Sequence, residues 1–251
     1  MKKQFTAFAL FLVLSVNLLT PFTASAQEKL RVAVAANYIQ AFGELAAGFE
    51  AKTGVKVEGT FSSSGNFYAQ ITNGAPYDLF LSADEDRPAR LYKDGLVEKP
   101  FVYATGRVVL WSARKGFCTP KNWQDALQQK GIKKIAIANP LTAPYGTAAM
   151  AALQKAGQWE PLKEKIVNAQ DIAQSFQFAS TQAVDAGFCA LSATVSSGGR
   201  KGCFYPVEEA PLIVQSACVL KRTKSRDTAE RFAAYLQSPE ADKIKEKYGY
   251  R

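Results

Sequence analysis

Small polar residues gather at four places that the sequence predicts to be turns. They are 36–38 (Ala-Asn-Tyr), 62–65 (Ser-Ser-Ser-Gly), 139–146 (Asn-Pro-Leu-Thr-Ala-Pro-Tyr-Gly) and 171–172 (Asp-Ile). In a parallel sheet such turns lie at the carboxyl edge, where helix N-termini present free backbone N–H groups. Free N–H groups, the positive end of the helix dipole and Ser or Asn side chains together form a neutral anion-binding site.

A single turn of this kind is most simply a helix cap, because Ser and Asn are common N-cap residues. Several converging turns favour the anion site. Catalysis has little support, since the chain contains no His and therefore has no Ser-His-Asp, Cys-His or His-zinc machinery. The serine run also lacks a G-x-S-x-G frame. We expect a binding protein and not an enzyme, with a serine hydrolase that uses Ser64 as a remote alternative.

The charge balance is basic, with 31 Lys+Arg against 22 Asp+Glu and a formal net charge of +9. This favours an anionic partner without identifying it. Acidic residues between 78 and 86 could suggest a metal cluster, but Asp84 is more simply a helix cap, and the spacing is not that of a calcium loop. The basic stretches 200–201 and 243–247 read as solvated faces, so no nucleic acid is expected.

The elements that must position these turns alternate between strands and helices. Strands are predicted at 30–35, 55–61 and 78–82, and helices at 39–53 and 66–73. This βαβαβ order implies an α/β fold with a parallel sheet and helices on both faces.

The rest of the chain repeats the theme, with strands at 107–112, 134–138, 187–191, 203–207 and 212–220 and helices at 123–129, 146–156 and 227–236. If strands 107–112 and 212–220 pair as crossing segments, residues 27–108 plus 215–251 form lobe 1 and residues 109–214 form lobe 2. Ligands usually bind in a cleft between such lobes.

The first 26 residues have the pattern of a signal peptide. Lys2 and Lys3 precede an apolar run over 5–19, and 24–26 (Ala-Ser-Ala) is a cleavage signature. The run is short for a membrane anchor, which is the less favoured alternative. No later stretch is long and apolar enough to span a bilayer, and no Cys marks a lipoprotein site. We therefore expect an exported periplasmic protein that begins at Gln27.

Export makes disulfides the default for the four cysteines. Zinc is not expected, because there is no CxxC pair and no His. Three pairings are open. The strands expected to be neighbours favour Cys189–Cys203 together with Cys118–Cys218.

From about Leu30 to Tyr250 the chain resembles the periplasmic molybdate-binding proteins of ABC importers. The motifs that carry the resemblance are 34–37 (Val-Ala-Ala-Asn), 61–65 (Phe-Ser-Ser-Ser-Gly), 69–71 (Ala-Gln-Ile), 73–84 (Asn-Gly-Ala-Pro-Tyr-Asp-Leu-Phe-Leu-Ser-Ala-Asp), 139–140 (Asn-Pro), 144–146 (Pro-Tyr-Gly) and 247–250 (Lys-Tyr-Gly-Tyr). The resemblance implies the two-lobed type II periplasmic binding protein fold. Each lobe is then a mainly parallel sheet flanked by helices, and two crossing hinge strands join the lobes.

The resemblance also implies the contacts to the ligand. They fall on Asn37 with the Ala36 backbone, on Ser64, on Tyr145 after Pro144, and on the backbone N–H of Ile172. Many relatives carry a tyrosine where this chain has Ala190, and Tyr145 is expected to replace that phenol from another loop.

The expected ligand is molybdate or tungstate, which the sequence does not distinguish. These ions are unprotonated dianions, so a site made only of donors suits them, and the metal is held through its oxygens with no protein atom as a metal ligand. No cofactor is expected. The partner is an ABC permease, the mature chain is expected to be a monomer, and no bond is made or broken. Sulfate, phosphate or a small organic anion is the first alternative, and an adhesin or scaffold without a ligand is another.

Overall fold

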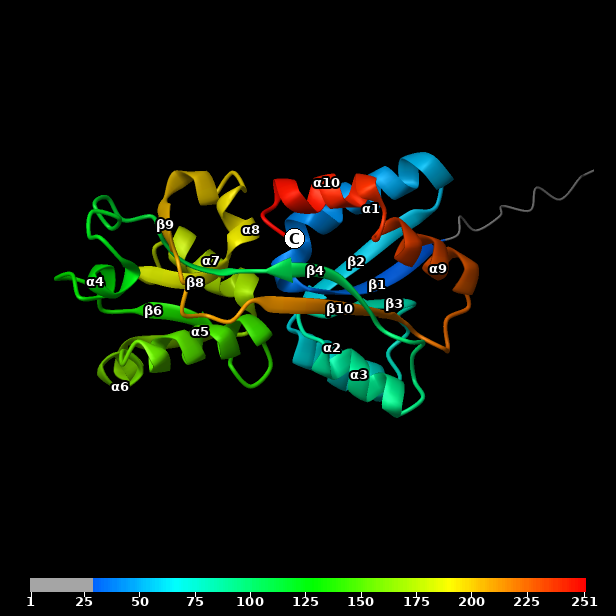
Figure 1. Ribbon diagram of the computed structural model, residues 1–251, viewed down its shortest axis with the longest axis horizontal. Helices are drawn as coiled ribbons and strands as arrows, with labels where there is room; N and C mark the ends of the chain where they lie inside the picture. The colour runs from blue at the N-terminus through cyan, green and yellow to red at the C-terminus, as the bar shows by residue number, and fades with distance from the viewer. Residues whose placement is uncertain (1–28) are drawn as a thin grey trace, which may run out of the picture.

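Two mixed β-sheets, each covered by helices on both faces, form the part of the chain that the computed structural model describes, residues 29–251 (Figure 1). Lobe 1 denotes the sheet β2-β1-β3-β10-β4 with its helices, and lobe 2 the sheet β7-β6-β8-β5-β9 with its helices. The predicted signal peptide, 1–26, lies outside the described residues.

In lobe 1, β1 pairs in parallel with β2 and β3, while β10 runs antiparallel to β3 and β4. Its elements are β1 (Lys29–Ala35), η1 (Ala36–Tyr38), α1 (Ile39–Thr53), β2 (Lys56–Ser62), α2 (Ser64–Thr72), β3 (Leu79–Leu81), α3 (Asp86–Lys93), β4 (Phe101–Gly106), β10 (Ile213–Val219), α9 (Arg226–Tyr235) and α10 (Pro239–Lys247).

In lobe 2, β6 pairs in parallel with β7 and β8, while β5 runs antiparallel to β8 and β9. Its elements are β5 (Val108–Ser112), α4 (Trp123–Leu127), β6 (Ile135–Ala138), α5 (Pro144–Lys155), α6 (Trp159–Leu162), η2 (Lys163–Lys165), β7 (Ile166–Ala169), α7 (Ile172–Ser180), β8 (Ala186–Ala190), α8 (Leu191–Thr194), η3 (Gly199–Lys201) and β9 (Cys203–Pro206). In both lobes three parallel strands therefore form one side of the sheet, and one antiparallel strand, β10 or β5, joins them to the last strand at the other edge.

The helix α1 shows how local sequence sets these elements. Its apolar residues recur at helical spacing, so Phe42, Leu45 and Phe49 lie buried on one face. Gly54 ends the helix with φ 72°, a left-handed conformation that glycine adopts without a Cβ clash, and its N–H bonds Glu50 O at 2.8 Å.

Each sheet has hydrophobic core on both faces. In lobe 1, Val32 and Val34 of β1 pack toward α1 and α9, whereas Ala33 between them packs toward α2 and α3. This is the alternation expected for a strand buried on both sides. In lobe 2, one core lies under α4 and α5, and the other contains Trp111 beside α7. Because helices cover both faces of each sheet, the ends of the strands are the part of the sheet that remains open to form a site.

The chain crosses between the lobes twice, from β4 into β5 and from β9 into β10. The expected pairing of 107–112 with 212–220 is wrong, because β5 and β10 belong to different sheets. The partner of β10 is β4, a strand that the sequence analysis did not predict. The predicted two-lobed α/β fold with crossing strands is nonetheless confirmed.

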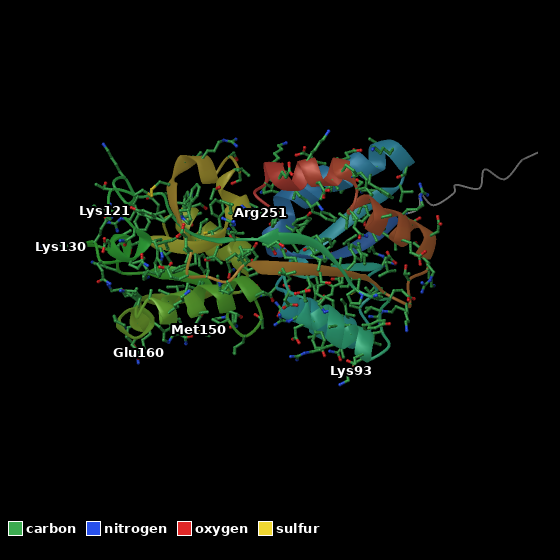
Figure 2. The ribbon with its side chains drawn as sticks, viewed as in Figure 1. Lys93, Lys121, Lys130, Met150, Glu160 and Arg251 are labelled. Carbon is green, nitrogen blue, oxygen red and sulfur yellow. A yellow bond between two sulfur atoms is a disulfide. The ribbon has the colours of Figure 1, made fainter. Side chains whose placement is uncertain are left out.

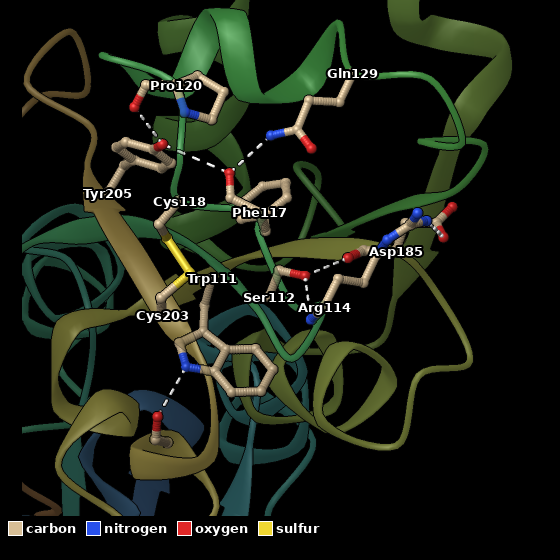
Figure 3. Close-up of a disulfide and its surroundings, with 11 residues drawn as sticks. Trp111, Ser112, Arg114, Phe117, Cys118, Pro120, Gln129, Asp185, Cys203 and Tyr205 are labelled. Atoms are coloured by element: carbon tan, nitrogen blue, oxygen red, sulfur yellow. Dashed lines mark hydrogen bonds and ion pairs between the residues drawn. A yellow bond between two sulfur atoms is a disulfide. The ribbon is translucent and has the colours of Figure 1, made fainter.

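The disulfide joins Cys118 to Cys203, so both expected pairings are wrong (Figure 3). Cys189 lies on the opposite face of the lobe 2 sheet from Cys203, in the core beside α7. Cys218 lies in lobe 1, in the core beneath α2, while Cys118 lies in lobe 2. Both remaining cysteines are buried free thiols whose pKa burial raises.

Among residues 29–251, no helix is long and apolar enough to cross a membrane.

Candidate functional site

A small cavity lies where the two lobes meet at the ends of their strands. It is small and partly open to solvent. All five predicted site residues line it, and the lining is Ala35, Ala36, Asn37, Ser62, Ser63, Ser64, Ala83, Ala143, Pro144, Tyr145, Asp171 and Ile172. A larger hollow bounded by Arg107, Leu191 and Leu212 shares no lining residue with this cavity.

The lobes are closed around this cavity. Gly65 N–H donates to Thr142 O across the boundary at 2.8 Å, and a Cβ at Gly65 would come within 2.9 Å of the Thr142 backbone. On the other side Ser192 Oγ donates to Asn37 O at 2.8 Å. Ala36 of lobe 1 also belongs to the same hydrophobic core cluster as residues of lobe 2. The cavity is therefore bounded by both lobes at once.

The serine run supplies one side-chain donor, and the structure separates the roles of its three members. Ser63 caps α2 by accepting from Asn66 N–H, and Ser62 Oγ accepts from the Asn66 side chain. Ser64 is fully buried, and its Oγ accepts the backbone N–H of Ala83 at 2.9 Å. Because that oxygen is already an acceptor, the hydroxyl hydrogen of Ser64 remains to donate into the cavity.

Lobe 2 contributes backbone donors from two helix N-termini. Pro144 is the first residue of α5, followed by Tyr145, and Ile172 is the first residue of α7. The N–H groups of Tyr145 and Ile172 cannot bond within their own helices, because the first turn has no preceding carbonyl partner. They lie at the positive ends of the two helix dipoles, which favour an anion.

Asn37 lies in the turn η1 directly after β1 and is also buried. Its side-chain nitrogen donates to Gln215 Oε1 at 2.7 Å and to the Tyr250 hydroxyl at 3.1 Å. Its Oδ1 has no hydrogen-bond partner among the described residues. The side chain of Asn37 thus joins the cavity wall to a polar network, and its side-chain nitrogen is already engaged there.

The described cavity wall contains no positively charged side chain, and the helix dipoles are its positive element. Neither Lys nor Arg belongs to the described lining, and Asp171 uses its carboxylate to cap α7 through Gln174 N–H at 2.9 Å. Within residues 29–251 there is no cluster of His, Cys, Asp or Glu side chains that could bind a metal ion. Asp84 accepts from Ser82 Oγ and from Arg87 N–H in the first turn of α3, as a capping role requires.

A second hollow lies beside Ala190, the position at which the resemblance implied a tyrosine. That hollow shares Ala36, Asn37 and Ile172 with the cavity. The Tyr145 hydroxyl, expected to take the place of the absent phenol, is buried and has no hydrogen-bond partner in the described chain.

Three residues of the polar network were missed by the sequence analysis: Ser192, Gln215 and Tyr250. The Tyr250 hydroxyl donates to Asn37 O at 2.6 Å and lies 3.0 Å from Ser192 Oγ. Tyr250 belongs to the closing motif of the resemblance, which was the available signal, but its place beside the first turn depends on tertiary structure.

Two closed α/β lobes around a small, donor-lined cavity are typical of a solute-binding protein. The model of the family described as bacterial extracellular solute-binding protein matches residues 30–251, and the chain belongs to this family.

Similar proteins agree with this assignment. The molybdate-binding protein ModA of Azotobacter vinelandii is 39% identical over 232 residues, 90% of this chain and 91% of that protein. ModA of Rhodobacter capsulatus is 39% identical over 220 residues, 87% and 86% of the two chains. The solved periplasmic molybdate-binding protein of Azotobacter vinelandii matches with a TM-score of 0.82 at 36% identity, covering 88% of this chain and 98% of that one. The predicted family is thereby confirmed.

Proposed function

We propose that this protein binds molybdate or tungstate between its lobes and delivers it to an ABC permease. The observation that carries the proposal is the cavity wall, which brings the Ser64 hydroxyl together with the N-termini of α5 and α7 and contains, among the described residues, no positively charged side chain. The two ModA relatives, whose names state molybdate binding, support the choice of ion.

In this proposal lobe 1 holds the ion through Ser64 and the turn at Ala36-Asn37, and lobe 2 completes the shell through the N–H groups of Tyr145 and Ile172. Each hydrogen bond to an ion contributes about 1.5–3 kcal/mol. Together they offset the cost of ordering the two lobes around the ligand. The closed shape is then what the permease recognises.

The proposal also includes the bounds of the lobes, the export of the chain, its oligomeric state and the absence of a chemical reaction. Lobe 1 comprises 27–108 plus 215–251 and lobe 2 comprises 109–214. The signal peptide at 1–26 directs export to the periplasm. The mature chain acts as a monomer that performs no chemical reaction and needs no cofactor, and the metal of the ion is reached only through its oxygens.

Protonation separates this ligand class from phosphate. A protonated phosphate needs an acceptor for its own hydrogen, whereas molybdate and tungstate need only donors. Asp171 Oδ1 accepts Gln174 N–H as the cap of α7, and the proposed contacts to the ion are all donors. Sulfate satisfies the same donors, so discrimination against it rests on cavity size.

Calorimetric titration of the mature protein with molybdate, tungstate, sulfate and phosphate tests the proposal. We expect sub-micromolar binding of molybdate and tungstate, and sulfate binding that is at least a hundredfold weaker. Tighter binding of sulfate or phosphate would contradict the choice of ligand. Absence of heat and of thermal stabilisation with all four ions would contradict an oxyanion-binding role altogether.

A further inference from the structure

The phenol of Tyr145 crosses from lobe 2 to the hinge side of lobe 1. Tyr145 belongs to α5, yet its hydroxyl lies so close to Gly106 that a Cβ there would come within 2.0 Å of it. The same Cβ would lie 2.8 Å from Gln215 Nε2. Gly106 ends β4 directly before the chain crosses to β5, so this glycine leaves the space that the phenol occupies at the crossing.

Three unpartnered polar atoms meet at this place. They are the Tyr145 hydroxyl, Asn37 Oδ1 and Gln215 Nε2, each buried without a partner among the described residues. Their chemistry is complementary, because an amide oxygen accepts, an amide nitrogen donates and a hydroxyl does both. Leaving all three unpaired in a buried site would cost free energy, so mutual pairing is favoured.

The neighbouring groups keep this phenol neutral. Burial raises the pKa of Tyr145 well above its usual value, and the nearby Tyr250 hydroxyl adds to the rise. The side chains of Asn37 and Gln215 lie close enough to oppose it. A neutral phenol can donate one hydrogen bond and accept another.

The surrounding contacts tie the same place to the C-terminus. The Tyr250 ring packs edge-on against Tyr38, with 4.9 Å between centroids. Next to it, Arg251 exchanges two backbone hydrogen bonds with Thr105 of β4. Arg251 lies where the two lobes meet (Figure 2). Three segments of lobe 1 are therefore held together around the Tyr145 hydroxyl: the turn at Tyr38, strand β4 at Thr105, and the C-terminal end of the chain.

We propose that the Tyr145 hydroxyl stabilises the closed protein by donating to Asn37 Oδ1 and accepting from Gln215 Nε2, while the backbone N–H of the same residue binds the oxyanion. Gly106 and Gln215 are positioning residues for this contact. The inference rests on the proposed function, and it assigns the phenol to lobe closure where direct contact with the ion was the expectation.

One residue would then link ligand binding to closure. An ion at the N-terminus of α5 orders the Tyr145 backbone, and the phenol of the same residue holds α5 against β4 and β10. Removing the hydroxyl leaves every oxyanion donor in place and destabilises only the closed state. The expected result is weaker binding through faster release.

The test titrates sodium molybdate into Tyr145→Phe, Gly106→Ala and Gln215→Met, with Tyr248→Phe as the matched control. The Tyr248 hydroxyl bonds Glu44 Oε2 on the outside of lobe 1, away from the cavity. We expect about tenfold weaker binding in each of the three variants and unchanged binding in the control. Wild-type affinity in Gly106→Ala would overturn the proposal, because its methyl group would occupy the place of the phenol oxygen.

A double variant separates closure from direct contact with the ion. The change Gln215→Met also removes the Oε1 acceptor of the Asn37 side chain in both backgrounds. If the phenol pairs with Gln215, the change therefore weakens binding less, but still measurably, when Tyr145→Phe is already present. If the phenol instead contacts the ion, the two effects add, since Gln215 is absent from the described cavity wall. Additive effects would overturn the proposal.

Small-angle X-ray scattering gives a readout that loss of packing alone would not change. Wild type and Tyr248→Phe should become more compact on saturation with molybdate, and saturated Tyr145→Phe should compact less. Equal compaction in Tyr145→Phe would overturn the inference. Failure of wild type to bind molybdate would instead overturn the proposed function, so the two outcomes are distinguishable.

Discussion

The two lobes contribute donors of different kinds to one cavity. Lobe 1 supplies a side-chain hydroxyl, that of Ser64, which is aimed by its bond from Ala83 N–H. Lobe 2 supplies the backbone N–H groups of Tyr145 and Ile172 at two helix N-termini. The donor in lobe 1 depends on residue type, whereas the donors in lobe 2 depend on where a helix begins.

This difference has consequences for substitution. A hydroxyl is lost by almost any replacement of Ser64, but a backbone N–H survives every replacement of Ile172 except proline. The comparison therefore predicts that the two halves of the site differ in their sensitivity to substitution. Three experiments test this prediction.

The largest effect is expected in lobe 1. Ser64→Ala removes a donor to the ion and also leaves the buried Ala83 N–H without its acceptor. We expect molybdate affinity to fall about 10- to 100-fold, and stability to fall by about 1–3 kcal/mol. Titration calorimetry and thermal unfolding measure the two effects.

The control for this variant is Ser180→Ala at the end of α7. Its hydroxyl bonds Gln177 O within its own helix, away from the cavity. Equal affinity in Ser64→Ala and wild type would show that lobe 1 does not donate through this side chain.

A smaller effect is expected in lobe 2, where two substitutions of one residue isolate the N–H group. Ile172 is the first residue of α7 and follows Asp171, whose backbone is extended with φ −150° and ψ −179°. Proline is tolerated after such a residue and at the first position of a helix. Ile172→Pro therefore removes the N–H at a position where the fold permits it.

Ile172→Ala is the matched control, because it also loses the buried side chain but keeps the N–H group. We expect about tenfold weaker molybdate binding in the proline variant than in the alanine variant, measured by the same titration. Similar affinities in the two variants would contradict a backbone contact at Ile172.

The sequence predicted the elements whose pattern is strong. Helix α1 has its apolar residues at helical spacing, and β1 is a largely apolar, β-branched run ended by a turn. Strand β4 was missed although its residues at 101–105, Phe-Val-Tyr-Ala-Thr, form an aromatic and β-branched run that indicates a strand. Without β4, the partner of β10 could not be found.

The sequence revealed the site only in part, because lobe 1 donates through a side chain and lobe 2 donates through its backbone. The serine run indicates a donor directly, although three neighbouring hydroxyls look alike until the fold assigns two of them to α2. The sequence placed Tyr145 and Ile172 in two of the predicted turns, but their side chains are not the donors, so only the family resemblance assigned the contacts to these two residues. The disulfide pairing depends on which face of the sheet each cysteine occupies. The spacing of the cysteines along the sequence does not reveal that face.

The smallest effect is expected from pH, and it tests whether either lobe relies on a charged donor. The chain has no His. Burial raises the pKa of Tyr145, and it raises the pKa of Tyr250 to about 12. Since a phenol is neutral below its pKa, raising the pKa extends the neutral form to higher pH. Molybdate affinity should therefore stay constant from about pH 6 to about pH 9.

Above about pH 10 the tyrosines of the unfolded chain lose their protons while the buried ones keep theirs, so stability falls as pH rises. Each buried tyrosine contributes a slope of about 1.4 kcal/mol per pH unit there. Thermal unfolding and titration across this range measure both trends. A change in affinity near neutral pH would mean that an ionisable side chain, and not the neutral hydroxyl of lobe 1 with the backbone of lobe 2, holds the ion.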